Sequence, residues 1–101
     1  MMLENFRTYQ LARSFYFNCR GLKMKGHCKD QFDRALLSIV LNLAEGSGKL
    51  TAKDKRRFYA IAFGSLREVQ ALLDLNGYDR ALKLSDPLAA SLYRLIQRPV
   101  A

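Results

Sequence analysis

The sequence predicts an all-α protein, an up-down-up-down antiparallel four-helix bundle. Leucine and alanine dominate its apolar residues, while valine, isoleucine and threonine, which favour strands, are scarce. Only two prolines occur, Pro87 and Pro99, so most of the chain contains no helix breaker. Apolar residues recur at helical spacing in stretches that short turns containing glycine or asparagine separate. With 101 residues, half of them hydrophobic, the chain fits one domain over residues 1–101.

The first helix is expected over residues 4–22. Two adjacent apolar stripes along it form a wide hydrophobic face that would pack on the other helices. Gly21 and Gly26 end this helix, and residues 24–29, which include His27, are expected to form a loop.

The second helix is expected to begin near Asp30, a candidate N-cap, and to end at Glu45 or Gly46. It is apolar around most of its circumference, so we expect it to be buried against several neighbours. One narrow polar stripe interrupts the apolar surface at spacings of three and four residues. The stripe consists of Gln31, Arg34, Ser38, Asn42 and Glu45.

The third helix is expected to start after Thr51 and to end at Leu75. Thr51 and Asp54 have the spacing of a capping box, and an Asn-Gly pair follows Leu75. An interior glycine costs about 1 kcal/mol relative to alanine, so Gly64 requires a compensating reason. Phe58, near the start of this helix, is expected to pack in the core.

The fourth helix is interrupted in the sequence. Residues 78–84 are expected to form a helical turn or a first segment. Ser85 is then the expected N-cap of the final helix, with Asp86 and Pro87 in its first turn.

The net charge of +8 indicates a polyanionic partner, RNA or DNA first, although such a charge also serves solubility. The bundle topology places one basic cluster in the first loop and another at the opposite end. The second cluster is the candidate nucleic-acid site: Lys49, Lys53, Lys55, Arg56, Arg57, Arg94 and Arg98. Arg7 is expected at the same end. Cations at a helix N-terminus oppose the helix dipole, and a phosphate-rich partner would account for them.

Other classes of function find little support in the sequence. Cys19, Cys28 and His27 offer too few ligands for a typical zinc site, so no metal or other cofactor is expected. No apolar stretch approaches the roughly 20 residues of a membrane helix, and the N-terminus lacks the pattern of a signal peptide. We therefore expect a cytoplasmic protein with no membrane contact. No catalytic constellation or glycine-rich phosphate loop is found, so no enzymatic activity is expected.

Three segments resemble a known family, the four-helix bundle proteins encoded in intervening sequences of bacterial 23S ribosomal RNA genes. The segments are YQLA from Tyr9, QFDRALLSIVLNLAEGSGK from Gln31 and FYAIAFGSLREV from Phe58. This family is related to the accessory variability proteins of diversity-generating retroelements. The resemblance spans about residues 6–78. It implies a homo-oligomer, typically a pentameric ring, with RNA or other nucleic-acid contact and no catalytic activity.

The family positions carried over to this chain include Ser65 and Glu68 on the third helix as well as the polar stripe of the second. We expect these two sets to meet each other, or their copies in a neighbouring subunit, as a polar network or subunit interface. Arg34 or Arg67 is expected to pair with a carboxylate there. The alternative is that the stripe is only the solvent face of the second helix. The alternative function is an oligomeric scaffold that binds a protein partner without contacting nucleic acid.

Overall fold

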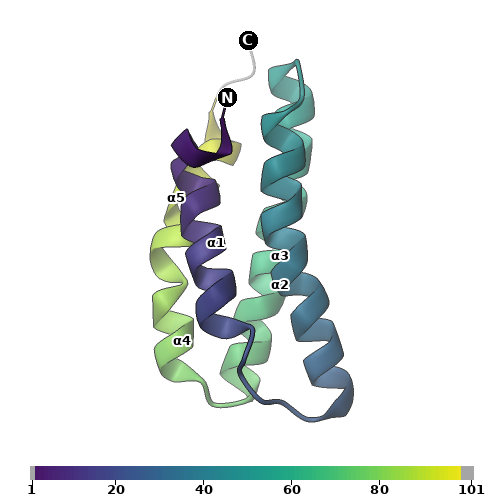
Figure 1. Ribbon diagram of the computed structural model, residues 1–101, viewed down its shortest axis with the longest axis vertical. Coiled ribbons are helices and arrows are strands. Elements are labelled where there is room, and N and C mark those ends of the chain that lie inside the picture. Colours follow the sequence, from purple (N-terminus) through teal and green to yellow (C-terminus); the bar gives the residue numbers. More distant parts are fainter. Residues whose placement is uncertain (1, 99–101) are drawn as a thin grey trace.

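The computed structural model describes residues 2–98; Met1 and residues 99–101 of the expected domain lie outside the described part. The described chain is built from helices, as predicted (Figure 1). The elements are a 3-10 turn η1 (Leu3–Asn5), α1 (Arg7–Cys19), α2 (Gly26–Ser47), α3 (Ala52–Leu75), α4 (Asp79–Leu84) and α5 (Asp86–Gln97). Helices α4 and α5 follow one another closely and together form the fourth leg of the bundle.

The legs alternate in direction, which confirms the four-helix bundle. Figure 1 shows the start of α1, the end of α5 and the α2–α3 turn at one end, and the α1–α2 and α3–α4 connections at the other. The bundle measures 43 × 22 × 22 Å. None of the helices within residues 2–98 combines the length and hydropathy that crossing a bilayer requires.

One hydrophobic core runs along the bundle axis. Its most deeply buried large side chains come from α2, α3 and α5 and include Phe32, Leu36, Ile39, Leu43, Leu66, Val69, Leu73, Leu88 and Leu92. From α1, Ala12, Phe15 and Cys19 complete it. Their spacing of three and four residues is the periodicity that predicted these helices.

Helix α1 is shorter than expected. Residues 3–5 form a separate 3-10 turn, and Phe6 has an extended backbone between this turn and the helix. The amide of Gln10 donates to the Leu3 carbonyl and ties the turn to α1. At the other end, α1 stops at Cys19, three residues before the predicted boundary at Leu22.

Helix α2 begins at Gly26, so the expectation that it begins at Asp30 is wrong. The backbone N–H groups of Cys28 and Lys29 both donate to the Lys25 carbonyl, which extends the helix by one turn. The Lys29 ammonium reaches back to the Arg20 and Leu22 carbonyls, each at 2.9 Å. This tertiary contact fixes the early start, and His27 and Cys28 therefore lie in the helix rather than in a loop.

Helix α3 has the predicted bounds. The Thr51 hydroxyl accepts a hydrogen bond from the Asp54 backbone N–H at 3.1 Å, which satisfies one of the free donors of the first turn. Asn76 and Gly77 end the helix, and Gly77 has a positive φ of 77° that favours glycine.

Ser85 lies between α4 and α5, as expected, but its side chain does not cap α5. Its hydroxyl donates to the Leu82 carbonyl at 2.6 Å and accepts from the Gln70 amide at 2.9 Å. The residue is fully buried. Ser85 therefore closes α4 and joins the fourth leg to α3.

Candidate nucleic-acid interface

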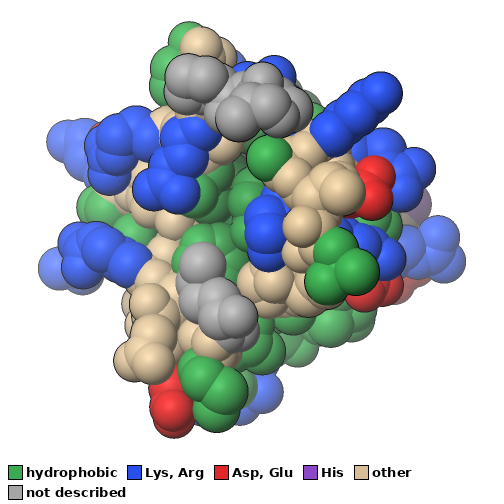
Figure 2. Space-filling model, turned by 90° about the horizontal axis from the view of Figure 1, so that it is seen from above, with side chains coloured by type: hydrophobic (Ala, Val, Ile, Leu, Met, Phe, Trp, Pro, Cys, Tyr) green, Lys and Arg blue, Asp and Glu red, His purple; other side chains and the backbone are tan. Residues whose placement is uncertain are grey.

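The predicted basic residues gather at one end of the bundle, which we call the basic end. The α2–α3 turn and the first turns of α3 bring Lys49, Lys53, Lys55, Arg56 and Arg57, while α5 and its C-terminal neighbour bring Arg94 and Arg98. Arg7 adds a cation from the start of α1. Figure 2 looks onto this end and shows Lys and Arg side chains around a hollow with a hydrophobic floor. The acidic residues in the same region are Glu4, Glu45 and Asp54.

Two cations of the basic end lie over an aromatic ring. The Lys49 ammonium and the Arg57 guanidinium lie 4.9 and 5.1 Å from the centre of the Phe58 ring. Lys49 also lies 4.0 Å from the Glu45 carboxylate. Phe58 is half-buried beneath these charges and is not part of the core, so the expected core position is wrong. The buried aromatic residue of this turn is its neighbour Tyr59.

Two further cations contact backbone carbonyls. The Lys55 ammonium donates to the Ser47 carbonyl at 2.9 Å and so caps the C-terminus of α2. The Arg56 guanidinium donates from Nη2 to the Arg98 carbonyl at 2.5 Å, which ties the end of α5 to α3. The Nε atom of Arg56 is buried and has no hydrogen-bond partner among the described residues.

The hollow in Figure 2 is a cleft between α1, α3 and α5, which we call the terminal cleft. Its volume is about 560 Å³, within the range of roughly 300–1,000 Å³ that is typical of ligand sites. It is lined by Asn5, Phe6, Arg7, Thr8, Ala52, Lys55, Arg56, Tyr59, Ser91, Arg94, Leu95 and Arg98. The lining holds cations, hydroxyls and apolar groups, and none of these residues is acidic.

The walls of the terminal cleft are held in place by two contacts between helices. The Thr8 and Ser91 hydroxyls, both buried, share a hydrogen bond of 2.6 Å that joins α1 to α5. The Phe6 and Tyr59 rings pack 5.8 Å apart and join α1 to α3. Burial raises the pKa of the Tyr59 phenol, and the Arg98 charge partly offsets that rise. The phenol is therefore a neutral group beside the Arg98 cation.

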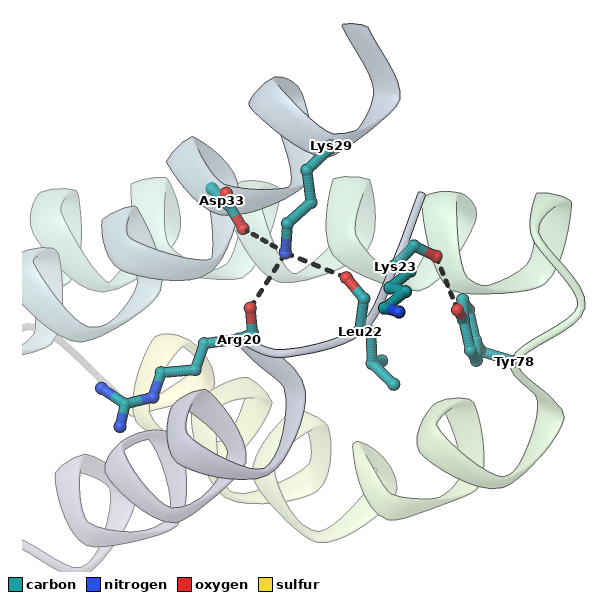
Figure 3. A network of polar contacts seen from close by, with 6 residues as sticks. All are labelled: Arg20, Leu22, Lys23, Lys29, Asp33 and Tyr78. Atoms are coloured by element: carbon teal, nitrogen blue, oxygen red, sulfur yellow. Dashed lines mark hydrogen bonds and ion pairs between the residues drawn. The ribbon is translucent and has the colours of Figure 1, made fainter. Parts of the chain in front are cut away.

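At the opposite end of the bundle, Lys29 is held by carbonyl and carboxylate groups of the chain. Lys29 donates to two carbonyls of the α1–α2 connection and lies 3.0 Å from the Asp33 carboxylate (Figure 3). The Tyr78 hydroxyl donates to the Lys23 carbonyl and fastens the same connection to the α3–α4 turn. The acidic residues of the flanking helix ends are Asp30, Asp33, Asp74 and Asp79. Charge at this end is thus more nearly balanced.

The predicted polar stripe divides into two parts. Ser38, Asn42 and Ser65 are half-buried between α2 and α3: the Ser38 and Ser65 hydroxyls lie 2.7 Å apart, and the Asn42 amide donates to Ser38. The remaining members are exposed: Gln31, Arg34, Glu45 and Glu68. The ion pairs among the described residues are Lys29–Asp33 and Lys49–Glu45, and Arg67 instead donates to Gln70. The expected pairing of Arg34 or Arg67 with a carboxylate is therefore not formed within this protomer.

Several cleft residues were not singled out from the sequence. Thr8 and Ser91 are polar residues on apolar helix faces, a signal that could have marked a contact between α1 and α5. Phe6 belongs to an apolar stripe of the first helix, and Tyr59 follows the basic cluster, where base stacking is possible. Nothing local in the sequence shows that these two rings lie beneath a surface hollow.

The cysteines and the histidine do not come together. Among residues 2–98 there is no group of three or more His, Cys, Asp or Glu side chains placed to hold a metal ion. Burial raises the pKa of the Cys19 thiol from 9.0 to about 11, so this thiol is protonated at neutral pH.

These features define a small helical bundle with one strongly basic end and an open cleft in that end. A family model for 23S rRNA-intervening sequence proteins matches residues 4–97, which is most of the chain. The protein belongs to this family. Neither a curated protein nor a solved structure matches the chain.

Proposed function

We propose that the protein is a non-enzymatic, self-associating helical bundle that binds RNA through its basic end. The observation that carries this proposal is the concentration of Lys and Arg side chains around the α2–α3 turn and the end of α5 (Figure 2). Few carboxylates accompany them, whereas the opposite end holds a Lys–Asp pair and further acidic residues. A one-sided field of this kind attracts polyanions.

The position of these cations on α3 adds to the proposal. Lys53 lies in the first turn of α3, where the dipole is positive and disfavours a close cation by about 0.3–1 kcal/mol. Arg56 and Arg57 follow in the second turn, where this effect falls off. A phosphate at this end would be attracted by the side chains and by the dipole together. Phosphate contact thus turns an unfavourable arrangement into a favourable one.

Salt-dependent binding of single-stranded RNA tests this proposal. With about five phosphates neutralised, the logarithm of the affinity should fall with the logarithm of salt with a slope of about −3.5. The triple variant Lys53→Gln, Arg57→Gln, Arg94→Gln should lower that slope by about 2. The control carries Arg20→Gln, Lys23→Gln and Lys25→Gln at the opposite end and has the same net charge. Equal losses in both variants, or no binding at low salt, would contradict an RNA site at the basic end.

The outer face of α2 and α3 supports the self-association in the proposal. Leu41 and Ile61 are 56% and 47% exposed in a protomer, on the two helices that the Ser38–Ser65 contact joins. Leu37 is 43% exposed and lies toward Tyr16 of α1. A Cβ on Gly64 would meet nothing within 4 Å, so no contact inside the protomer explains this glycine. A second copy packing on this face would cover Leu41 and Ile61 and use the open space. The family resemblance favours a ring of five subunits.

Light scattering of a Leu41→Gln variant tests the self-association. Leu84 on α4 is 53% exposed, close to the 56% of Leu41, and Leu84→Gln is therefore a matched control. The variant at Leu41 should lower the assembled mass, while the control should not. A mass that is the same for both variants and for the parent would place the contact elsewhere.

The exposed apolar face of α2 and α3 also favours a second candidate, a scaffold that binds a different protein. In that case the purified protein would bind RNA no better than the Lys53→Gln, Arg57→Gln, Arg94→Gln variant of its basic end. A pull-down from the native cell would then recover a defined partner in stoichiometric amount, and Leu41→Gln would abolish its recovery.

A further inference from the structure

We propose that the terminal cleft binds one phosphorylated nucleotide, with the phosphate held by Arg56, Arg94 and Arg98. The nucleotide is either the terminal unit of an RNA strand or a free nucleotide, since both offer the same phosphate, sugar and base. This inference deepens the proposed function and rests on it for the strand-end source. It adds a defined pocket to an otherwise diffuse electrostatic surface.

The first argument is the charge of the cleft. Arg7, Lys55, Arg56, Arg94 and Arg98 all line it, and no lining residue is acidic. Lys55 is occupied by the Ser47 carbonyl at the end of α2, whereas Arg7, Arg94 and Arg98 are exposed. A small concave site with cations on three sides concentrates field lines and favours a compact anion over a long, straight one.

The second argument is the state of Arg56. Its side chain is half-buried, its only described hydrogen bond goes to the Arg98 carbonyl, and its buried Nε has no partner within residues 2–98. A guanidinium that is partly removed from water normally faces a carboxylate or phosphate, because an unpaired charge destabilises its surroundings. No carboxylate among residues 2–98 lines this cleft, which leaves room for an anion from outside to face the guanidinium.

The third argument is the composition of the walls. The cleft lining includes the apolar residues Leu95, Phe6 and Tyr59 together with Thr8 and Ser91, whose hydroxyls bond each other. An inorganic anion would leave these apolar residues unused. A nucleotide presents a phosphate for the guanidinium groups and a flat base for the apolar residues.

The volume of the terminal cleft suits a single nucleotide. A cleft of about 560 Å³ lies in the range of small-molecule sites, and its position between three helix ends leaves it open to the surface. Proteins that read RNA bind unstacked bases at strand ends and loops rather than bases stacked in a duplex. The terminal cleft therefore fits one unstacked nucleotide at the end of a strand that lies over the basic end.

Isothermal titration calorimetry with 5′-AMP and 5′-UMP tests the pocket, with the unphosphorylated nucleosides and inorganic phosphate titrated separately. Both nucleotides should bind, and the nucleosides should not. Arg56→Gln should weaken nucleotide binding about tenfold or more, because it removes charge-assisted hydrogen bonds. Arg67→Gln, further along the same helix and outside the cleft, should change it by less than about twofold. Thermal unfolding of both variants verifies that each is folded, and Arg98→Gln provides a second test of the cleft if Arg56→Gln is not.

Short single-stranded RNA with a 5′-phosphate, a 3′-phosphate or neither identifies the source. A terminal phosphate that strengthens binding, with the gain lost in Arg56→Gln, assigns the cleft to a strand end. Nucleotide binding with no effect of terminal phosphates assigns it to a free nucleotide.

Three results would overturn the inference. The first is no nucleotide binding at millimolar concentration, and the second is phosphate binding as tight as nucleotide binding. The third is an equal effect of Arg56→Gln and Arg67→Gln. If the nucleotides fail while RNA still binds with a steep salt dependence, the pocket is wrong and the proposed function stands. If no RNA binds either, both fail.

Discussion

Gly46 and Gly64 are interior helix glycines in opposite situations. A Cβ on Gly46 would lie 2.7 Å from Cε1 of Tyr59 and 3.1 Å from Cβ of Phe58, so glycine lets α2 approach α3 closely. A Cβ on Gly64 would meet nothing within 4 Å. The first glycine is explained inside the protomer, and the second requires an explanation outside it.

The two glycines give a paired prediction. Gly46→Ala should destabilise the fold by about 1–3 kcal/mol, since the aromatic side chains must shift to admit a methyl group. Gly64→Ala should stabilise the protomer by up to about 1 kcal/mol, because alanine is the better helix former. Urea unfolding at low protein concentration measures both. Destabilisation by Gly64→Ala under those conditions would contradict the open space on that side of α3.

Cys19 gives a prediction about alkaline pH. Its pKa is raised from 9.0 to about 11 in the folded protein, so between these values the folded state keeps a proton that the unfolded state loses. Stability should therefore fall as pH rises from 9 to 11, by up to about 3 kcal/mol from this thiol. Cys19→Ala removes the titrating group and should show a shallower decline. Parallel stability curves for the two proteins over this range would contradict the assigned burial effect.

At the scale of elements, the two longest helices, α2 and α3, show which helix boundaries can be predicted from nearby residues. The bounds of α3 could be predicted because Thr51, Asp54 and the Asn-Gly pair after Leu75 act within one turn of each end. The start of α2 could not be predicted in this way, because Lys29 contacts the α1–α2 connection and the helix begins at Gly26, before Asp30. Ser85 was placed correctly between two helices, but its buried bond to Gln70 depends on a helix distant in sequence.

The same distinction applies to the candidate site. The gathering of cations at one end followed from the up-down topology, which sets where each helix begins and ends. The terminal cleft did not follow, because it depends on how the start of α1, the start of α3 and the end of α5 are placed relative to one another. Phe58 and Tyr59 illustrate this. The rotation of α3 about its own axis decides which of these two adjacent rings is buried, and the sequence alone does not specify that rotation.

The Ser38–Ser65 hydrogen bond links the polar residues of α2 to those of α3. The two hydroxyls lie 2.7 Å apart, and the Asn42 amide donates to Ser38 at 3.0 Å. A double-mutant cycle with Ser38→Ala and Ser65→Ala should give a coupling energy of about 0.5–1.5 kcal/mol in urea unfolding. A coupling energy near zero would mean that the pair contributes no more than its separate side chains.

For the whole molecule, shape and charge act together. The bundle is twice as long as it is wide, at 43 × 22 × 22 Å, so its two ends present separate surfaces to a partner. One end carries a Lys–Asp pair and further acids, and the other gathers cations around a cleft. Leu41 on α2 and Ile61 on α3 are exposed along the side of the bundle. This arrangement fits assembly through the side of the bundle and RNA contact through its end.

Native mass spectrometry of the freshly purified protein tests this arrangement most directly, because it reports the subunit number and any retained RNA together. The account predicts a single homo-oligomer with bound RNA, and it predicts that the Lys53, Arg57, Arg94 triple variant keeps the assembly but loses the RNA. An 11.6 kDa monomer free of nucleic acid, unchanged in the triple variant, would contradict the account.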